Sequence, residues 1–162
     1  MKPTFDTLNK NYYSYNELMP NYLSGSDLYA EMGLDHDALM KQNPAYENTC
    51  ATRMSLALLK SGVPFTGRLT IKSGKYTSKK IETGAKLLAD QLMRPDVFGR
   101  PELYTPDNFL KKVKGRKGVV LFWKIENYGG GHIDLIDVTT LNAVCSSGCY
   151  YQSKEIWFWP LD

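Results

Sequence analysis

The sequence predicts an α+β domain, with helices in the first part of the chain and an antiparallel sheet in the second. Up to residue 113, apolar residues mostly recur at helical spacing between capping residues and glycine or proline stops. From residue 118, apolar stretches alternate with glycine-rich turns, which is typical of buried strands joined as a meander. A chain of 162 residues can bury a self-sufficient core, so we expect one domain over residues 1–162.

The composition excludes several classes of protein. With 43% hydrophobic and 23% charged residues, the chain is typical of a soluble globular protein. No stretch approaches the roughly 18 apolar residues of a membrane span, so none is expected. A net charge of +3 is too small to indicate a nucleic-acid partner. Residues 1–6 lack the apolar core of a secretory signal, so export would need a dedicated machine.

Short helices are expected in the first part of the chain. One is predicted over residues 26–33 and another over residues 35–42, each opened by a capping side chain. His36 lies between two aspartates in the second helix. We expect a surface imidazole there, rather than a catalytic group or a metal ligand.

The stretch from Asn48 to Gly62 predicts a buried helix of about three turns with Cys50 in its first turn. Asn48 and Thr49 are good N-terminal caps, and Gly62 can end the helix. The positive end of the helix dipole stabilises a thiolate at this position. The alternative is that Cys50 is a small buried hydrophobic residue, as most free cysteines are.

The remaining elements follow from periodicity. Extended chain is expected over residues 65–72, and a helix from Ser78 until a proline ends it. Thr105 caps a further helix, whose basic end at residues 111–117 we expect to be a solvated face. Strands are predicted over residues 118–125, 132–138 and 154–159.

Cys50 and His132 have the layout of papain-type thiol hydrolases, a cysteine at a helix start and a histidine that opens a later strand. The imidazole takes the thiol proton and later protonates the leaving amine. The backbone N–H of Cys50 is expected to be free for the oxyanion. A third polar group must orient the histidine. Asp134 shares a strand face with His132, whereas Asp137 faces the other way unless the strand bends.

The other two cysteines admit two interpretations. Cys145 and Cys149 are separated by three small residues, a spacing that allows a disulfide across a tight loop. They could instead form half of a zinc site, which would need Cys50 and a histidine as well. We favour the disulfide, which indicates an oxidising working compartment.

Four motifs carry a family resemblance: Asn48–Ser55, Gly131–Leu135, Cys145–Cys149 and Ile156–Leu161. In this order they resemble the family-four amidase effectors of type VI secretion systems, relatives of NlpC-type papain-like peptidoglycan hydrolases. The resemblance implies helices packed on a C-terminal antiparallel sheet. It also implies an enzyme that is made in the cytoplasm and injected into the periplasm of rival bacteria. There it would cleave the D-glutamate–meso-diaminopimelate amide of stem peptides, without metal or cofactor, and the producer would hold a cognate immunity protein.

Carried over residue by residue, the nucleophile is Cys50 and the general base is His132. The third residue does not transfer, because family members can place an aspartate in the loop between the paired cysteines and this loop has none. Asp134 is the preferred candidate, and Ser147 and Asn142 are alternatives. Two rival functions remain open, namely a papain-like deamidase or transglutaminase-type toxin and a non-catalytic wall-binding module.

Overall fold

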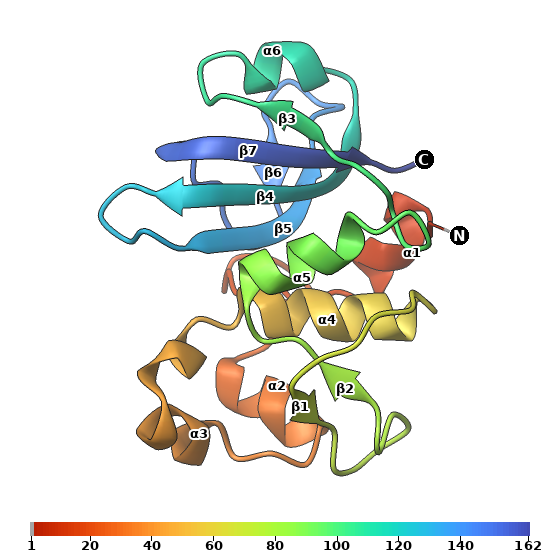
Figure 1. The fold of residues 1–162 in the computed structure, drawn as a ribbon, viewed down its shortest axis with the longest axis vertical. Coiled ribbons are helices and arrows are strands. Elements are labelled where there is room, and N and C mark those ends of the chain that lie inside the picture. The colour runs from red at the N-terminus through yellow and green to blue at the C-terminus, as the bar shows by residue number, and fades with distance from the viewer. Residues whose placement is uncertain (1) are drawn as a thin grey trace.

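The computed structural model describes residues 2–162 as a helical part packed against one face of a sheet (Figure 1). The helices are α1 (Phe5–Lys10), α2 (Gly25–Glu31), α3 (His36–Gln42), the 3₁₀ turn η1 (Pro44–Glu47), α4 (Cys50–Lys60), α5 (Ala85–Leu92) and α6 (Phe109–Val113). The strands are β1 (Leu69–Thr70), β2 (Lys80–Ile81), β3 (Glu102–Tyr104), β4 (Lys117–Ile125), β5 (Gly131–Asp137), β6 (Val144–Cys145) and β7 (Ser153–Pro160). Among these residues, no helix is long and apolar enough to cross a membrane.

Five strands form one antiparallel sheet in the order β3-β7-β4-β5-β6. β4 is the central strand, and its continuous apolar sequence is explained because both of its faces are covered. Val119 and Leu121 pack in the core shared with α4 and α5, whereas Val120 and Phe122 pack under α6. The predicted buried strand and the predicted α+β class are both confirmed.

α4 lies between the sheet and a smaller layer made of α2, α3 and the β1–β2 pair (Figure 1). Met54 and Leu58 belong to the core against the sheet, and Leu56 packs with the smaller layer. Every residue from Cys50 to Leu58 is therefore buried, including the polar ones. This confirms the prediction of a buried helix, and it places the N-terminus of α4 next to the start of β5.

Three local predictions are wrong. The helix expected from Ser78 begins only at Ala85, because Ile81 pairs with Leu69 in the two-stranded sheet. The helix expected after Thr105 is reduced to the five residues of α6, preceded by a turn. His36 is 8% exposed rather than at the surface. Its ring stacks on Tyr29 with centroids 4.6 Å apart, and its Nε2 lies 2.7 Å from the Tyr46 carbonyl oxygen.

Candidate active site

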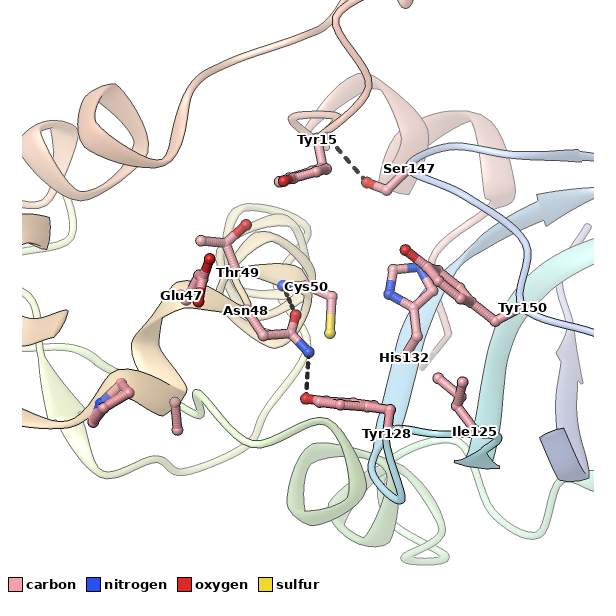
Figure 2. Close-up of a pocket in the computed structure, with 13 residues that line it drawn as sticks. Tyr15, Glu47, Asn48, Thr49, Cys50, Ile125, Tyr128, His132, Ser147 and Tyr150 are labelled. Atoms are coloured by element: carbon pink, nitrogen blue, oxygen red, sulfur yellow. Dashed lines mark hydrogen bonds between the residues drawn. The ribbon is translucent and has the colours of Figure 1, made fainter. Parts of the chain in front are cut away.

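A cavity of about 390 Å³ opens above the N-terminus of α4. One wall is formed by the residues that lead into α4, and the other by β5, the β4–β5 turn and the disulfide loop (Figure 2). The lining side chains are mostly apolar or aromatic, apart from a few polar groups around Cys50 and His132. Such a cavity is typical of small-molecule and peptide sites.

His132 is held at the start of β5 with its ring against two aromatic residues. It pairs with Phe122 on β4, whose ring stacks at a centroid distance of 6.3 Å. The Tyr150 ring lies 4.7 Å away on a tilted plane. The Nε2 of His132 lies 2.8 Å from Oδ2 of Asp134, which leaves Nδ1 for Cys50. In Figure 2 the Cys50 sulfur lies in the cavity beside this imidazole.

The protonation of His132 is set by competing effects. Burial disfavours an imidazolium and by itself lowers the pKa of His132. Hydrogen bonds to Asp134 and Cys50, together with the negative charges of both, outweigh burial and raise the pKa of His132 to about 10. The site therefore stabilises an imidazolium beside Cys50.

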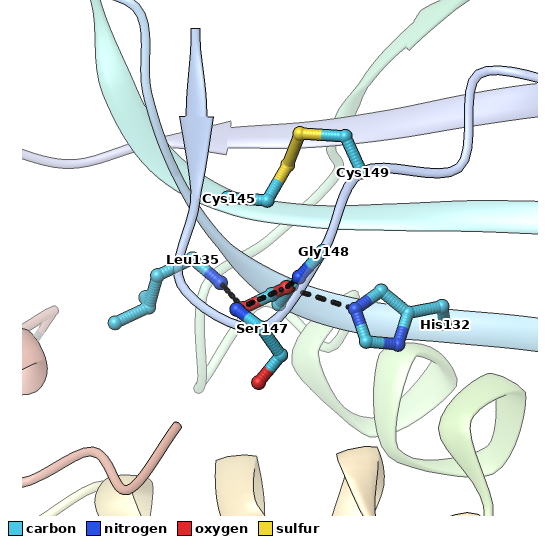
Figure 3. The surroundings of a disulfide bond; sticks show 7 residues. His132, Leu135, Cys145, Ser147, Gly148 and Cys149 are labelled. Carbon is cyan, nitrogen blue, oxygen red and sulfur yellow. Dashed lines mark hydrogen bonds and ion pairs between the residues drawn. A yellow bond between two sulfur atoms is a disulfide. The ribbon is translucent and has the colours of Figure 1, made fainter. Parts of the chain in front are cut away.

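Asp134 is fully buried, and its partners, which Figure 3 labels beside the disulfide, all donate to it. Besides His132, its carboxylate accepts the backbone N–H groups of Leu135 at 2.8 Å, Ser147 at 2.9 Å and Gly148 at 3.0 Å. These hydrogen bonds compensate the burial of the carboxylate. Asp134 is thus an acceptor that can hold the Nε2–H of His132 and fix its tautomer.

The disulfide between Cys145 and Cys149 is present, as the spacing predicted. It closes the loop that carries Ser147 and Gly148, so the loop presents two N–H donors to the carboxylate of β5. A loop without an acidic residue therefore still takes part in the site, through its backbone. The sequence pattern contains no signal for this contact.

The other candidates for the third residue lie elsewhere. The Ser147 hydroxyl bonds Tyr12 and the backbone of Tyr15, so it does not face His132. Asp137 accepts hydrogen bonds from the backbone and the hydroxyl of Thr139 at the end of β5. Asn142 is exposed in the following loop and does not line the cavity. Of the four candidates, only Asp134 forms a hydrogen bond with the imidazole.

Asn48 caps α4 as predicted, because its Oδ1 accepts the Cys50 N–H at 3.1 Å, whereas the Thr49 side chain makes no cap hydrogen bond, contrary to prediction. The Cys50 N–H is therefore not free for an oxyanion, contrary to expectation. Sequence reasoning missed the second contact of Asn48. Its Nδ2 donates to the Tyr128 hydroxyl at 2.9 Å, across the cavity (Figure 2). Tyr128 belongs to the glycine-rich β4–β5 turn, and its ring lies so close to Gly130 that a Cβ there would come within 2.7 Å. Because Asn48 Oδ1 already accepts the Cys50 N–H, a substrate carbonyl would reach this N–H only by displacing Asn48 Oδ1.

A cysteine at a helix N-terminus that faces a histidine on a neighbouring antiparallel strand defines the class of papain-like, NlpC-type thiol hydrolases. Comparison with known families identifies the member. Residues 46–159 match the family model of Tae4, the type VI secretion system amidase effector protein 4. The chain belongs to this family, as the motifs indicated. It is therefore a type VI secretion amidase effector, a peptidoglycan hydrolase.

Solved structures of the same family show the same fold. The Tae4–Tai4 effector–immunity complex from Salmonella Typhimurium aligns over 100% of both chains with a TM-score of 0.69 and 18% identity. The corresponding complex from Enterobacter cloacae aligns over 100% of both chains with a TM-score of 0.57 and 20% identity. Tae4 from Enterobacter cloacae without its immunity protein aligns over 100% of this chain and 98% of its own, with a TM-score of 0.58 and 20% identity. A search of curated protein sequences gave no significant match.

Proposed function

We propose that the protein hydrolyses the amide between D-glutamate and meso-diaminopimelate in peptidoglycan stem peptides. In this proposal Cys50 is the nucleophile, His132 is the general base and acid, and Asp134 orients His132. The observation that carries it is the series Cys50–His132–Asp134, whose first two members line the cavity, within a family of amidase effectors. Residues 1–162 would act as one catalytic domain.

The reaction runs in two halves. The Cys50 thiolate attacks the amide carbonyl carbon, and the oxyanion takes the place of Asn48 Oδ1 at the Cys50 N–H. The C–N bond then breaks as the imidazolium of His132 protonates the leaving amine through Nδ1, which leaves a thioester on Cys50. Neutral His132 next removes a proton from water, which attacks the thioester and releases the acid. Asp134 keeps Nε2 protonated throughout.

The test is to incubate purified muropeptides with the wild type and with Cys50→Ala and to analyse the products by mass spectrometry. We expect the wild type to release fragments cut between D-glutamate and diaminopimelate and Cys50→Ala to release none. Loss of Cys50 and His132 together should cost about as much as loss of either, because they act as a unit. Equal product from wild type and Cys50→Ala would refute the proposal.

We further propose delivery by the type VI machinery into the periplasm of target bacteria, with a Tai4-like immunity protein protecting the producer. The family description and the effector–immunity complexes of the structural relatives support this. Directing the wild-type chain to the periplasm of a test bacterium should lyse it, whereas cytoplasmic expression or periplasmic Cys50→Ala should not. Lysis by the cytoplasmic form alone would contradict it.

A further inference from the structure

The N-terminal segment Tyr12–Tyr15 lies outside the region matched by the family model, yet it contacts the back of the catalytic site. The Ser147 hydroxyl accepts the backbone N–H of Tyr15 at 3.0 Å (Figure 2). It also lies 2.8 Å from the hydroxyl of Tyr12. The Ser14 hydroxyl donates to the carbonyl of Ser146. Three contacts therefore join this segment to two adjacent residues of the disulfide loop.

The same loop residues hold the carboxylate behind the histidine. Ser147 presents its hydroxyl to the N-terminal segment and its N–H to Asp134. Asp134 in turn accepts from His132 at 2.8 Å. A continuous chain of hydrogen bonds thus runs from Tyr12 through Ser147 and Asp134 to His132. Tyr12 and Ser14 are 1% and 0% exposed, so solvent does not offer these groups alternative partners.

The segment is fixed from the other side by α4. Arg53, one turn after Cys50, donates to the carbonyls of Ser14 at 3.0 Å and of Leu23 at 2.7 Å. The helix that carries the nucleophile therefore also anchors the segment that reaches the disulfide loop. The site is preorganised, because the N-terminal segment contacts both the helix that carries Cys50 and the loop that holds Asp134.

We infer that Tyr12 and Ser147 are positioning residues, which act through Asp134 to hold the His132 ring in its catalytic orientation. The inference rests on the proposed function of Cys50 and His132. Without the Tyr12–Ser147 contact, the loop N–H groups are held less firmly against Asp134. The hydrogen bond between Asp134 and Nε2 of His132 then weakens. The imidazolium then loses support, so the alkaline limb of activity moves to lower pH.

The experiment compares Tyr12→Phe with Tyr13→Phe, measuring kcat/KM on muropeptides from about pH 6 to about pH 10. Tyr12→Phe keeps the buried ring and removes only the hydroxyl. Tyr13→Phe is a matched control, because the Tyr13 hydroxyl bonds Glu31 and Lys60 on the far side of the segment. We expect Tyr12→Phe to lower kcat/KM about three- to tenfold, the effect of one ordinary hydrogen bond, and to shift the alkaline limb to lower pH. Tyr13→Phe should move neither.

Ser147→Ala provides the second variant, since it keeps the backbone N–H to Asp134 and removes only the hydroxyl. It removes the Tyr12 contact and also the acceptor of the Tyr15 N–H, so it should shift the alkaline limb in the same direction and cost at least as much as Tyr12→Phe. The double variant should be no worse than Ser147→Ala alone, because that variant already lacks the Tyr12 contact. An unmoved pH profile in Tyr12→Phe, an equal shift in Tyr13→Phe, or additive losses in the double variant would each overturn the inference. If Cys50→Ala stays active, the proposed function itself fails, so the two failures are distinguishable.

Discussion

At the scale of single residues, Asp134 differs from the other carboxylate of β5 in what surrounds it. Asp134 is fully buried among donors and touches His132, whereas Asp137 is engaged with Thr139 at the strand end. Asp134→Asn can present an amide N–H to Nε2 and so favour the wrong tautomer. We expect it to lower kcat roughly 100-fold or more, by analogy with other catalytic triads.

The matched control for that change is Asp137→Asn, on the same strand but without contact to the imidazole. Its kcat on muropeptides should stay within about twofold of wild type, since surface substitutions away from special contacts have small effects. Steady-state kinetics of the two variants checks both expectations. A larger loss in Asp137→Asn than in Asp134→Asn would mean that the structure assigns the wrong carboxylate to His132.

The raised pKa of His132 gives a second prediction at this scale. Because the pKa is about 10 in the folded protein and about 6.5 in an unfolded chain, folding favours the protonated ring. This contribution to stability is complete below about pH 6.5 and is lost as the pH rises toward 10. The chain has two histidines, so NMR titration of the imidazoles can follow His132. We expect His132 to be an imidazolium at pH 8 in the wild type, and its pKa to fall in Asp134→Asn. A neutral His132 at pH 8 in the wild type would contradict this.

At the scale of elements, the disulfide loop is a positioning device more than a source of stability. The bridge joins cysteines only four positions apart, so closing it removes little entropy from the unfolded chain. We expect Cys145→Ser/Cys149→Ser to lose activity about tenfold, the cost of one weakened hydrogen-bond contact, with a small change in melting temperature. Thiol titration should find one thiol before reduction and three after it. Unchanged activity in the double variant would remove the loop from the site.

The β4–β5 turn gives another prediction at this scale. The Tyr128 hydroxyl holds the Asn48 amide, and Asn48 Oδ1 occupies the N–H that a substrate carbonyl needs. Tyr128→Phe removes only this hydroxyl. Without this hydroxyl the Asn48 amide is held less firmly, so a substrate carbonyl displaces it from the Cys50 N–H at a lower cost. We expect KM to fall by about threefold with kcat unchanged. Tyr22→Phe, also exposed but not lining the cavity, is the control. A fall in kcat at constant KM would instead indicate that the hydroxyl acts in the transition state.

The success of sequence reasoning also varied by element. The long patterns of α4 and β4 were sufficient, because each is buried on all sides and little else explains so much apolar sequence. The helix predicted from Ser78 was wrong because Ile81 and the residues of α5 share helical spacing by coincidence. Only the tertiary pairing of Ile81 with Leu69 separates them. His36 was misplaced because its aspartate neighbours suggested solvent, whereas stacking on Tyr29 buries it.

At the scale of the whole molecule, the site joins parts of the chain that sequence spacing does not relate. The sequence was sufficient to predict Cys50, His132 and Asp134 as site residues, because the first two lie at the starts of elements and Asp134 shares a strand face with His132. The loop partners of Asp134 could not be predicted, because they are the backbone N–H groups of Ser147 and Gly148, 13 and 14 residues later in the chain. Backbone donors have no side-chain signature, and their direction depends on the disulfide and on the N-terminal segment.

Arg53 shows the same dependence at the centre of the fold. Its side chain is 1% exposed, and it has an ion pair with no carboxylate among residues 2–162. Instead its guanidinium donates to Thr49 Oγ1 at 2.8 Å and to the carbonyls of Ser14 and Leu23. Burial lowers the pKa of Arg53, and these carbonyls are what compensates the buried charge.

Arg53→Met tests how far the whole molecule depends on this one side chain. Methionine fills a similar length but leaves the Leu23 carbonyl and the Thr49 hydroxyl without the Arg53 donor, whereas the Ser14 carbonyl still accepts the N–H of Leu23. Each group left without its partner costs about 1–3 kcal/mol, so a loss of at least about 2 kcal/mol is expected. For a chain of this size that lowers the melting temperature by about 4–8 °C, measurable by thermal circular dichroism. Arg94→Met is the control, because its ion pair with a neighbouring aspartate is exposed on both sides and contributes under about 1 kcal/mol. Equal melting temperatures for the two variants would show that the N-terminal segment does not depend on Arg53 for its place against α4.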